Sequence, residues 1–102
     1  MNKQSIPTIG QIVKILRGKD AGQLAVVLTH ANNKFVYIAD GDKRKFDQSK
    51  KKNLIHLESQ SYISSEVVNS LMENGRVTNG KLRHAVMMSR QSTESHAQEK
   101  GD

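Results

Sequence analysis

The sequence contains no cysteine, and it has no long apolar run. The first absence excludes a disulfide framework, a thiolate zinc site and a cysteine nucleophile, so the stability of the fold must come from packing. No window approaches 18 consecutive apolar residues, and the first ten residues, MNKQSIPTIG, lack the apolar segment of a signal peptide. These features predict a cytoplasmic protein without a membrane partner.

The sequence also lacks the motifs of common catalytic sites. Gly18-Lys19 resembles part of a nucleotide-binding P-loop, but Asp20 follows where Ser or Thr is required and Val13 stands where the motif has its first glycine. No G-x-S-x-G elbow is present, and the four histidines have no spacing typical of metal ligands: His30, His56, His84 and His96. We therefore expect no enzyme activity, no cofactor, no metal site and no small-molecule substrate.

Positive charge is concentrated in the first half of the chain. Residues 1–56 contain 11 Lys and Arg against 4 Asp and Glu, whereas residues 57–102 contain 5 against 6. Six of the basic residues fall in the window DKRKFDQSKKK at 42–52. A localised excess of this kind is typical of a surface that binds a polyanion such as nucleic acid. The alternative is a solvated edge whose lysines prevent strands from pairing between molecules.

The first 60 residues have the pattern of short strands. IVKILRGKDAGQLAVVL at 12–28 has two β-rich runs around a loop in which Gly18 and Gly22 supply the positive φ that a tight turn requires. KFVYIAD at 34–40 alternates like a strand, a turn at Asp40-Gly41 precedes KRKFD, and NLIHLES at 53–59 is one more short run. Five such strands predict a small β-barrel that closes its own edges. Because aromatic residues are few, we expect Phe35 and Tyr37 to pack in the core rather than to stack on bases.

Helical spacing begins after Ser61. Ser64 or Ser65 can cap a helix whose apolar stripe is Val67, Val68, Leu71 and Met72, and Gly75 ends it. A second helix is expected from about Thr78, with Leu82, Ala85 and Val86 on one side. QSTESHAQEKGD, after Arg90, has no large apolar residue and predicts disorder. The expected organisation is a barrel at 1–60, a helical extension at 61–90 that packs on or beside it, and a disordered tail at 91–102.

The segment GQIVKILRGKDAGQLAVVL at 10–28 resembles the KOW motif. The matching residues are Gly10, Val13, Ile15, Gly18, Lys19, Asp20, Gly22 and Val26. The chain is similar to small KOW-type large-subunit ribosomal proteins of archaea and eukaryotes, and to short bacterial RNA-binding proteins that share a segment like residues 39–58. Ala25 departs from the motif, which often has glycine there, and residues 60–102 match nothing general in it. The resemblance implies a mainly β fold built on an SH3-like barrel that binds ribosomal or other structured RNA.

The combined interpretation is a non-catalytic, ribosome-associated RNA-binding protein of the cytoplasm. Gly18, Asp20 and Gly22 are expected to shape the loop, and eight basic residues to bind RNA: Arg17, Lys19, Lys43, Arg44, Lys45, Lys50, Lys51 and Lys52. Ribosomal RNA is the expected partner, alongside a ribosomal or transcription protein. Two alternatives remain open, because SH3-like barrels also bind peptides and other KOW proteins serve transcription: a protein-interaction module and a transcription-associated KOW factor.

Overall fold

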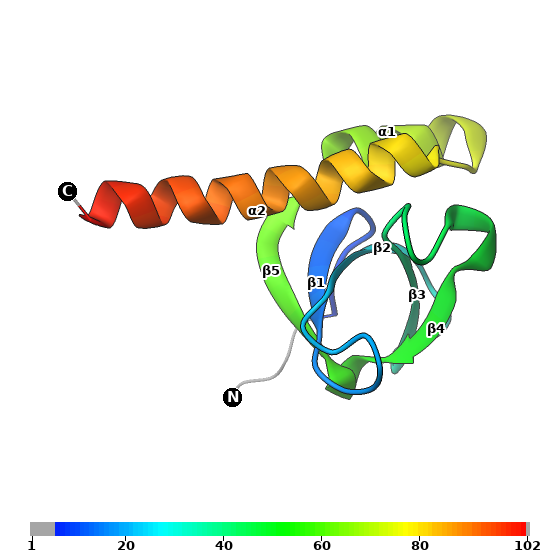
Figure 1. Cartoon of the computed structure of the whole chain (residues 1–102). Coiled ribbons are helices and arrows are strands. Elements are labelled where there is room, and N and C mark those ends of the chain that lie inside the picture. Colours follow the sequence, from blue (N-terminus) through cyan, green and yellow to red (C-terminus); the bar gives the residue numbers. More distant parts are fainter. Residues whose placement is uncertain (1–5, 102) are drawn as a thin grey trace.

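Five antiparallel strands form one curved sheet in the computed structural model, which describes residues 6–101, with side chains for residues 6–91 (Figure 1). The strands are β1 (Gln11–Ile15), β2 (Leu24–His30), β3 (Phe35–Ala39), β4 (Lys50–Asn53) and β5 (Leu57–Ile63). Their order in the sheet is β4-β3-β2-β1-β5. Within the described residues β4 and β5 are the two edges and are not paired with each other, so the sheet is not closed and the predicted barrel is not confirmed.

The fourth strand lies where the sequence did not predict one. Residues 46–48, which overlap the end of the expected KRKFD strand at 43–47, form a short 3-10 helix, and β4 consists of the lysine run that follows it. NLIHLES is also divided, because residues 54–56 form a second 3-10 helix in which the Asn53 side chain accepts a hydrogen bond from the Ile55 N–H at 3.0 Å. This corner turns the chain from β4 into β5.

Both faces of the central strands are buried. Neighbouring residues such as Ile12 and Val13 have no exposed surface, because each belongs to a different core cluster. One cluster lies between the sheet and the helices: Ile12, Val26, Leu28, Ala39, Val67, Val77, Leu82, Ala85 and Val86. The other consists of Val13, Ile15, Ala25, Val27, Val36 and Ile38, with Leu54 of the corner and Leu57 of β5 packed against it. Each fully buried aliphatic side chain contributes roughly 1.5–3 kcal/mol through the hydrophobic effect.

Both helices begin close to the predicted signals, and α1 also ends at the predicted one. In α1 (Ser65–Asn74) the Ser64 hydroxyl accepts a hydrogen bond from the Val67 N–H at 3.2 Å, and Gly75 ends the helix at φ +71°. In α2 (Asn79–Gly101) the Thr78 hydroxyl accepts from the Lys81 N–H at 3.2 Å. Met72 does not belong to the buried stripe, since 79% of its surface is exposed. The helices pack on the sheet through buried side chains, as expected for an extension that covers it: Val67, Leu82, Ala85 and Val86.

α2 continues well past the sheet (Figure 1). Residues 91–101, for which the sequence predicts disorder, form its last turns, and residue 102 lies outside the described residues. A polar helical segment of this length is marginally stable in water without packing partners, so disorder of the segment in solution stays a prediction. Across the described residues neither helix has the length and apolar character needed to cross a membrane.

Candidate nucleic-acid interface

The β1–β2 loop, residues 16–23, is held by its own backbone. The Gly22 N–H donates to the Ile15 carbonyl at 2.7 Å, and the Ile15 N–H donates to the Gln23 carbonyl at 2.9 Å, which closes the hairpin. Gly18 and Gly22 have φ values of +97° and +89°, the region that favours glycine. Arg17 and Lys19 are exposed at the tip of this loop.

The β3–β4 turn, residues 40–45, is held by hydrogen bonds from both sides. Internally, one oxygen of the Asp40 carboxylate accepts from the N–H groups of Asp42 and Arg44, each at 2.8 Å. Externally, the Arg83 guanidinium of α2 donates to the Gly41 carbonyl at 2.8 Å. Lys43 and Lys45 are exposed on this turn, while Arg44 is half-buried.

The start of α2 also touches the segment directly after the turn. The Phe46 N–H donates to the Asn79 side-chain oxygen at 2.7 Å. Gly41 lies so close to the helix that a Cβ on it would be 2.9 Å from the Leu82 Cβ and 3.0 Å from the backbone nitrogen of Arg83. The first turn of α2 therefore fixes the position of the basic turn.

The three lysines of β4 do not point to one side. In the pairing with β3, Lys50 is opposite Ile38 and Lys52 is opposite Val36, so both share a face with buried core residues. Lys51 is opposite Tyr37 on the other face, and its ammonium lies 5.1 Å from the centre of the Phe35 ring. The strand thus divides the lysine run between two surfaces.

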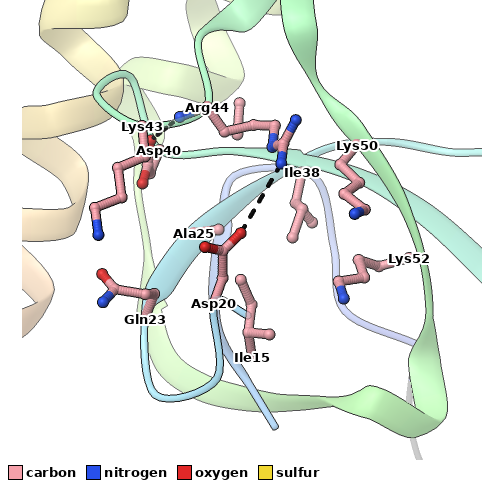
Figure 2. Close-up of a pocket in the computed structure, with 11 residues that line it drawn as sticks. Ile15, Asp20, Gln23, Ala25, Ile38, Asp40, Lys43, Arg44, Lys50 and Lys52 are labelled. Carbon is pink, nitrogen blue, oxygen red and sulfur yellow. Dashed lines mark hydrogen bonds and ion pairs between the residues drawn. The ribbon is translucent and has the colours of Figure 1, made fainter. Parts of the chain in front are cut away.

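Loop, turn and strand converge on one groove, which we call the loop groove (Figure 2). Its charged lining consists of Asp20, Asp40, Lys43, Arg44, Lys50 and Lys52. Asp20 of the loop and Arg44 of the turn approach to 3.9 Å, and the Lys52 ammonium lies 3.6 Å from the position of a Cβ on Gly18. The cavity in it is only about 20 Å³, room for roughly one water molecule. The groove is therefore a small hollow in which these charged side chains lie beside the apolar Ile15, Ala25, Ile38 and Ala39.

The predicted binding residues are brought together only in part. Lys43, Arg44, Lys50 and Lys52 line the loop groove beside Asp20, whereas Arg17, Lys19 and Lys45 are exposed outside its lining and Lys51 lies on the opposite face of β4. Four cations meet two acids here, and one of these acids, Asp40, already accepts two backbone hydrogen bonds. Such a lining can donate charge-assisted hydrogen bonds to an anion such as a phosphate. The described residues hold no cluster of three or more potential metal ligands.

The expectation that Phe35 and Tyr37 belong to the core is wrong. Both are half-buried and outside the two core clusters, whereas Phe46 and Tyr62 are the aromatic residues that pack against the core. Their strand position explains this, because they alternate with the buried Val36 and Ile38 and lie on β3 next to Lys51. Sequence reasoning also missed Asn79 and Arg83, whose contacts join segments 33 and 42 residues apart.

Comparison with known proteins identifies one informative relative. No protein-family model matches the chain. The chain is 44% identical over 71 residues to the protein named Putative ribosome-binding protein YbzG of Bacillus subtilis (strain 168), and the match covers 70% of this chain and 96% of the relative. Identity at this level over almost the whole relative shows common descent, so the chain belongs to the same family as YbzG.

Proposed function

We propose that this protein is a non-catalytic RNA-binding protein that associates with the ribosome in the cytoplasm. The observation that supports this most directly is the convergence of Arg44, Lys50 and Lys52 with the β1–β2 loop on the loop groove. The 44% identical relative is named Putative ribosome-binding protein YbzG, which agrees with a ribosomal partner for this chain. In this proposal the curved sheet is a KOW-type SH3-like barrel, left open between β4 and β5.

The mechanism is electrostatic. Lysine and arginine attract backbone phosphates and release their counterions, and arginine adds two parallel hydrogen bonds to one phosphate. Arg17, Lys19 and Lys45 extend the cationic surface around the groove, and Lys51 provides charge on the opposite face of β4. Contacts to phosphates fix position rather than sequence, so the protein would recognise the shape of a folded ribosomal RNA.

Ribosome co-sedimentation at low salt tests the proposal, followed by binding to purified ribosomal RNA by fluorescence anisotropy. We expect wild type to bind both, with log affinity falling against log salt at about −0.7 to −0.9 for each phosphate neutralised. Lys52→Glu should weaken binding to the RNA at least about tenfold, since it replaces a contact by a repulsion. Lys34→Glu is the matched control, because this exposed lysine lies in the β2–β3 turn at the other end of the strands.

Three outcomes would contradict the proposal or part of it. If wild type does not sediment with ribosomes and does not bind ribosomal RNA, the proposed function is wrong. If it sediments with ribosomes but ignores the purified RNA at every salt concentration, the partner is a ribosomal protein. Equal losses in Lys52→Glu and Lys34→Glu would mean that total charge, rather than the loop groove, governs binding. Thermal melting of both variants separates any such effect from unfolding.

A further inference from the structure

A second groove, which we call the helix groove, lies between α2 and the β3–β4 turn. It has a volume of about 210 Å³ and is lined by Lys43 and Asp42 of the turn and by Arg83, Val86 and Arg90 of the helix, among others. The charge distribution along the sequence places the whole basic excess in the first half of the chain and assigns no role to the second half. The fold instead places two arginines of that half beside the basic turn.

The helix presents its two arginines in a fixed orientation. Arg83, Val86 and Arg90 follow the 3–4 spacing of one helix face. Val86 is only 8% exposed and belongs to the core cluster, which prevents this face from rotating away. Seven residues separate the arginines, or roughly 10 Å along the helix, so their side chains can contact different parts of an extended ligand.

The charges in the helix groove favour an anion. Lys43, Arg83 and Arg90 face Asp40 and Asp42. Asp40 accepts two backbone hydrogen bonds, and within the described residues Arg83 donates one hydrogen bond, to the Gly41 carbonyl, although a guanidinium has five N–H donors. Arg90 is exposed and Asp42 is the acid that remains at the surface. The lining therefore offers more free donors than free acceptors.

Lys43 connects the two grooves. It lines both of them, together with Gln23 and Asp40. In Figure 2 the Lys43 and Gln23 side chains extend toward the side where the helix lies, away from Lys50 and Lys52. An anionic strand that leaves the loop groove over the turn would meet Arg83 and Arg90 next.

We propose that the helix groove binds a backbone phosphate of the same RNA, so that α2 is part of the RNA interface. This inference rests on the proposed function. The chemistry required is that of any phosphodiester: positive charge and N–H donors at a curved surface, with no base contact. It assigns to α2 a binding role in addition to its packing on the sheet.

Two substitutions with opposite expected effects test the inference, measured by anisotropy with purified ribosomal RNA. Arg90→Glu should weaken binding about fivefold. It should also reduce the magnitude of the slope of log affinity against log salt by about 0.7 to 0.9, the contribution of one phosphate contact. Asp42→Asn should tighten binding about twofold, because it removes a negative charge from the path of the phosphate. Lys34→Glu, away from both grooves, should change affinity less than twofold.

The opposite signs keep the test independent of folding. A variant that unfolds can only lose affinity, so tighter binding by Asp42→Asn is a gain that misfolding does not explain. If Lys52→Glu abolishes binding while Arg90→Glu and Asp42→Asn both equal wild type, the helix groove does not contact RNA and the proposed function still stands. If wild type itself fails to bind ribosomal RNA, the proposed function and this inference are both wrong.

Discussion

The β1–β2 loop and the β3–β4 turn contribute side chains to the same groove but are held in different ways. The loop is fixed by its own backbone, with hydrogen bonds between Ile15, Gly22 and Gln23. The turn depends on α2, through the Arg83 bond to the Gly41 carbonyl and the Asn79 bond to the Phe46 N–H. The β1–β2 loop is therefore held by local hydrogen bonds, and the β3–β4 turn is held in place by tertiary contacts with α2.

This difference assigns a role to the C-terminal helix. A turn that carries Lys43, Arg44 and Lys45 would lose fixed geometry without the helix, because its internal bonds from Asp40 define its shape but not its place against the sheet. Preorganised cations bind a ligand at lower entropic cost than mobile ones. Damage to the contact between the turn and α2 should therefore reduce both stability and RNA binding, whereas damage to the loop backbone should act locally.

The largest effect is expected for Gly41→Ala. Gly41 has φ +82°, and an added Cβ would lie 2.9 Å from the Leu82 Cβ and would collide with the Asn79 carbonyl oxygen. Positive φ costs an L-residue roughly 1–2 kcal/mol, and overpacking against a helix adds roughly 1–3 kcal/mol. Urea denaturation should show a loss of at least ~2 kcal/mol in the free energy of unfolding. A loss below ~1 kcal/mol would contradict the close contact between the turn and α2.

Asn79→Ala should have an intermediate effect. It leaves the half-buried Phe46 N–H without its acceptor, at a cost of about 1–2 kcal/mol. Hydrogen exchange should become faster at the Phe46 amide and remain unchanged at the Gly22 amide, which belongs to the self-contained loop. Asn79→Asp keeps the accepting oxygen and should behave like wild type. Equal acceleration at both amides would mean that the two segments are not independent.

Gly22→Ala sharpens the comparison because Gly22 has a positive φ like that of Gly41, so an alanine would be strained in the same way at either position. The φ values are +89° and +82°, but nothing lies within 4 Å of a Cβ on Gly22. Only the cost of the positive φ for an L-residue remains, so we expect a loss of about 1–2 kcal/mol in the free energy of unfolding. The difference between Gly41→Ala and Gly22→Ala then measures the steric cost of a Cβ against the helix. If the two variants lose the same stability, the helix does not obstruct a Cβ at residue 41.

The elements that the sequence predicts well are those with local causes. β-branched runs around Gly18 and Gly22 predict the first hairpin, and Ser64 and Gly75 predict the ends of α1, because a cap or a positive φ is decided by a few neighbouring residues. β4 was missed because KKKN has little strand propensity. Its structure comes from pairing with β3, a tertiary effect that overrides local preference.

The same distinction separates the predicted and the missed parts of the candidate site. Charge clustering identified Arg44, Lys50 and Lys52, which line the loop groove. The period of two along β4 would have removed Lys51 from that group if the strand had been recognised. Asn79 and Arg83 had no sequence signal, since their partners are 33 and 42 residues away. Contacts over such separations depend on how the helix packs.

The smallest effect on stability is expected where the two segments touch, at the Asp20–Arg44 pair. The side chains of Arg44 and Asp20 are 38% and 36% exposed, and the Arg44 Nη2 lies 3.9 Å from the Asp20 Oδ2. An ion pair of this kind contributes at most about 1 kcal/mol, so Asp20→Asn should change the melting temperature little.

Binding should respond more, because the substitution removes a negative charge from beside Arg44, Lys50 and Lys52. We expect the affinity for ribosomal RNA to rise about twofold to fivefold at low salt and the gain to disappear as salt screens the groove. Asp47→Asn removes an equal charge next to Arg76, outside the loop groove, and should leave affinity unchanged. A gain of the same size in both variants would show that net charge alone controls binding, and a loss in Asp20→Asn would mean that Asp20 holds Arg44 in its binding position.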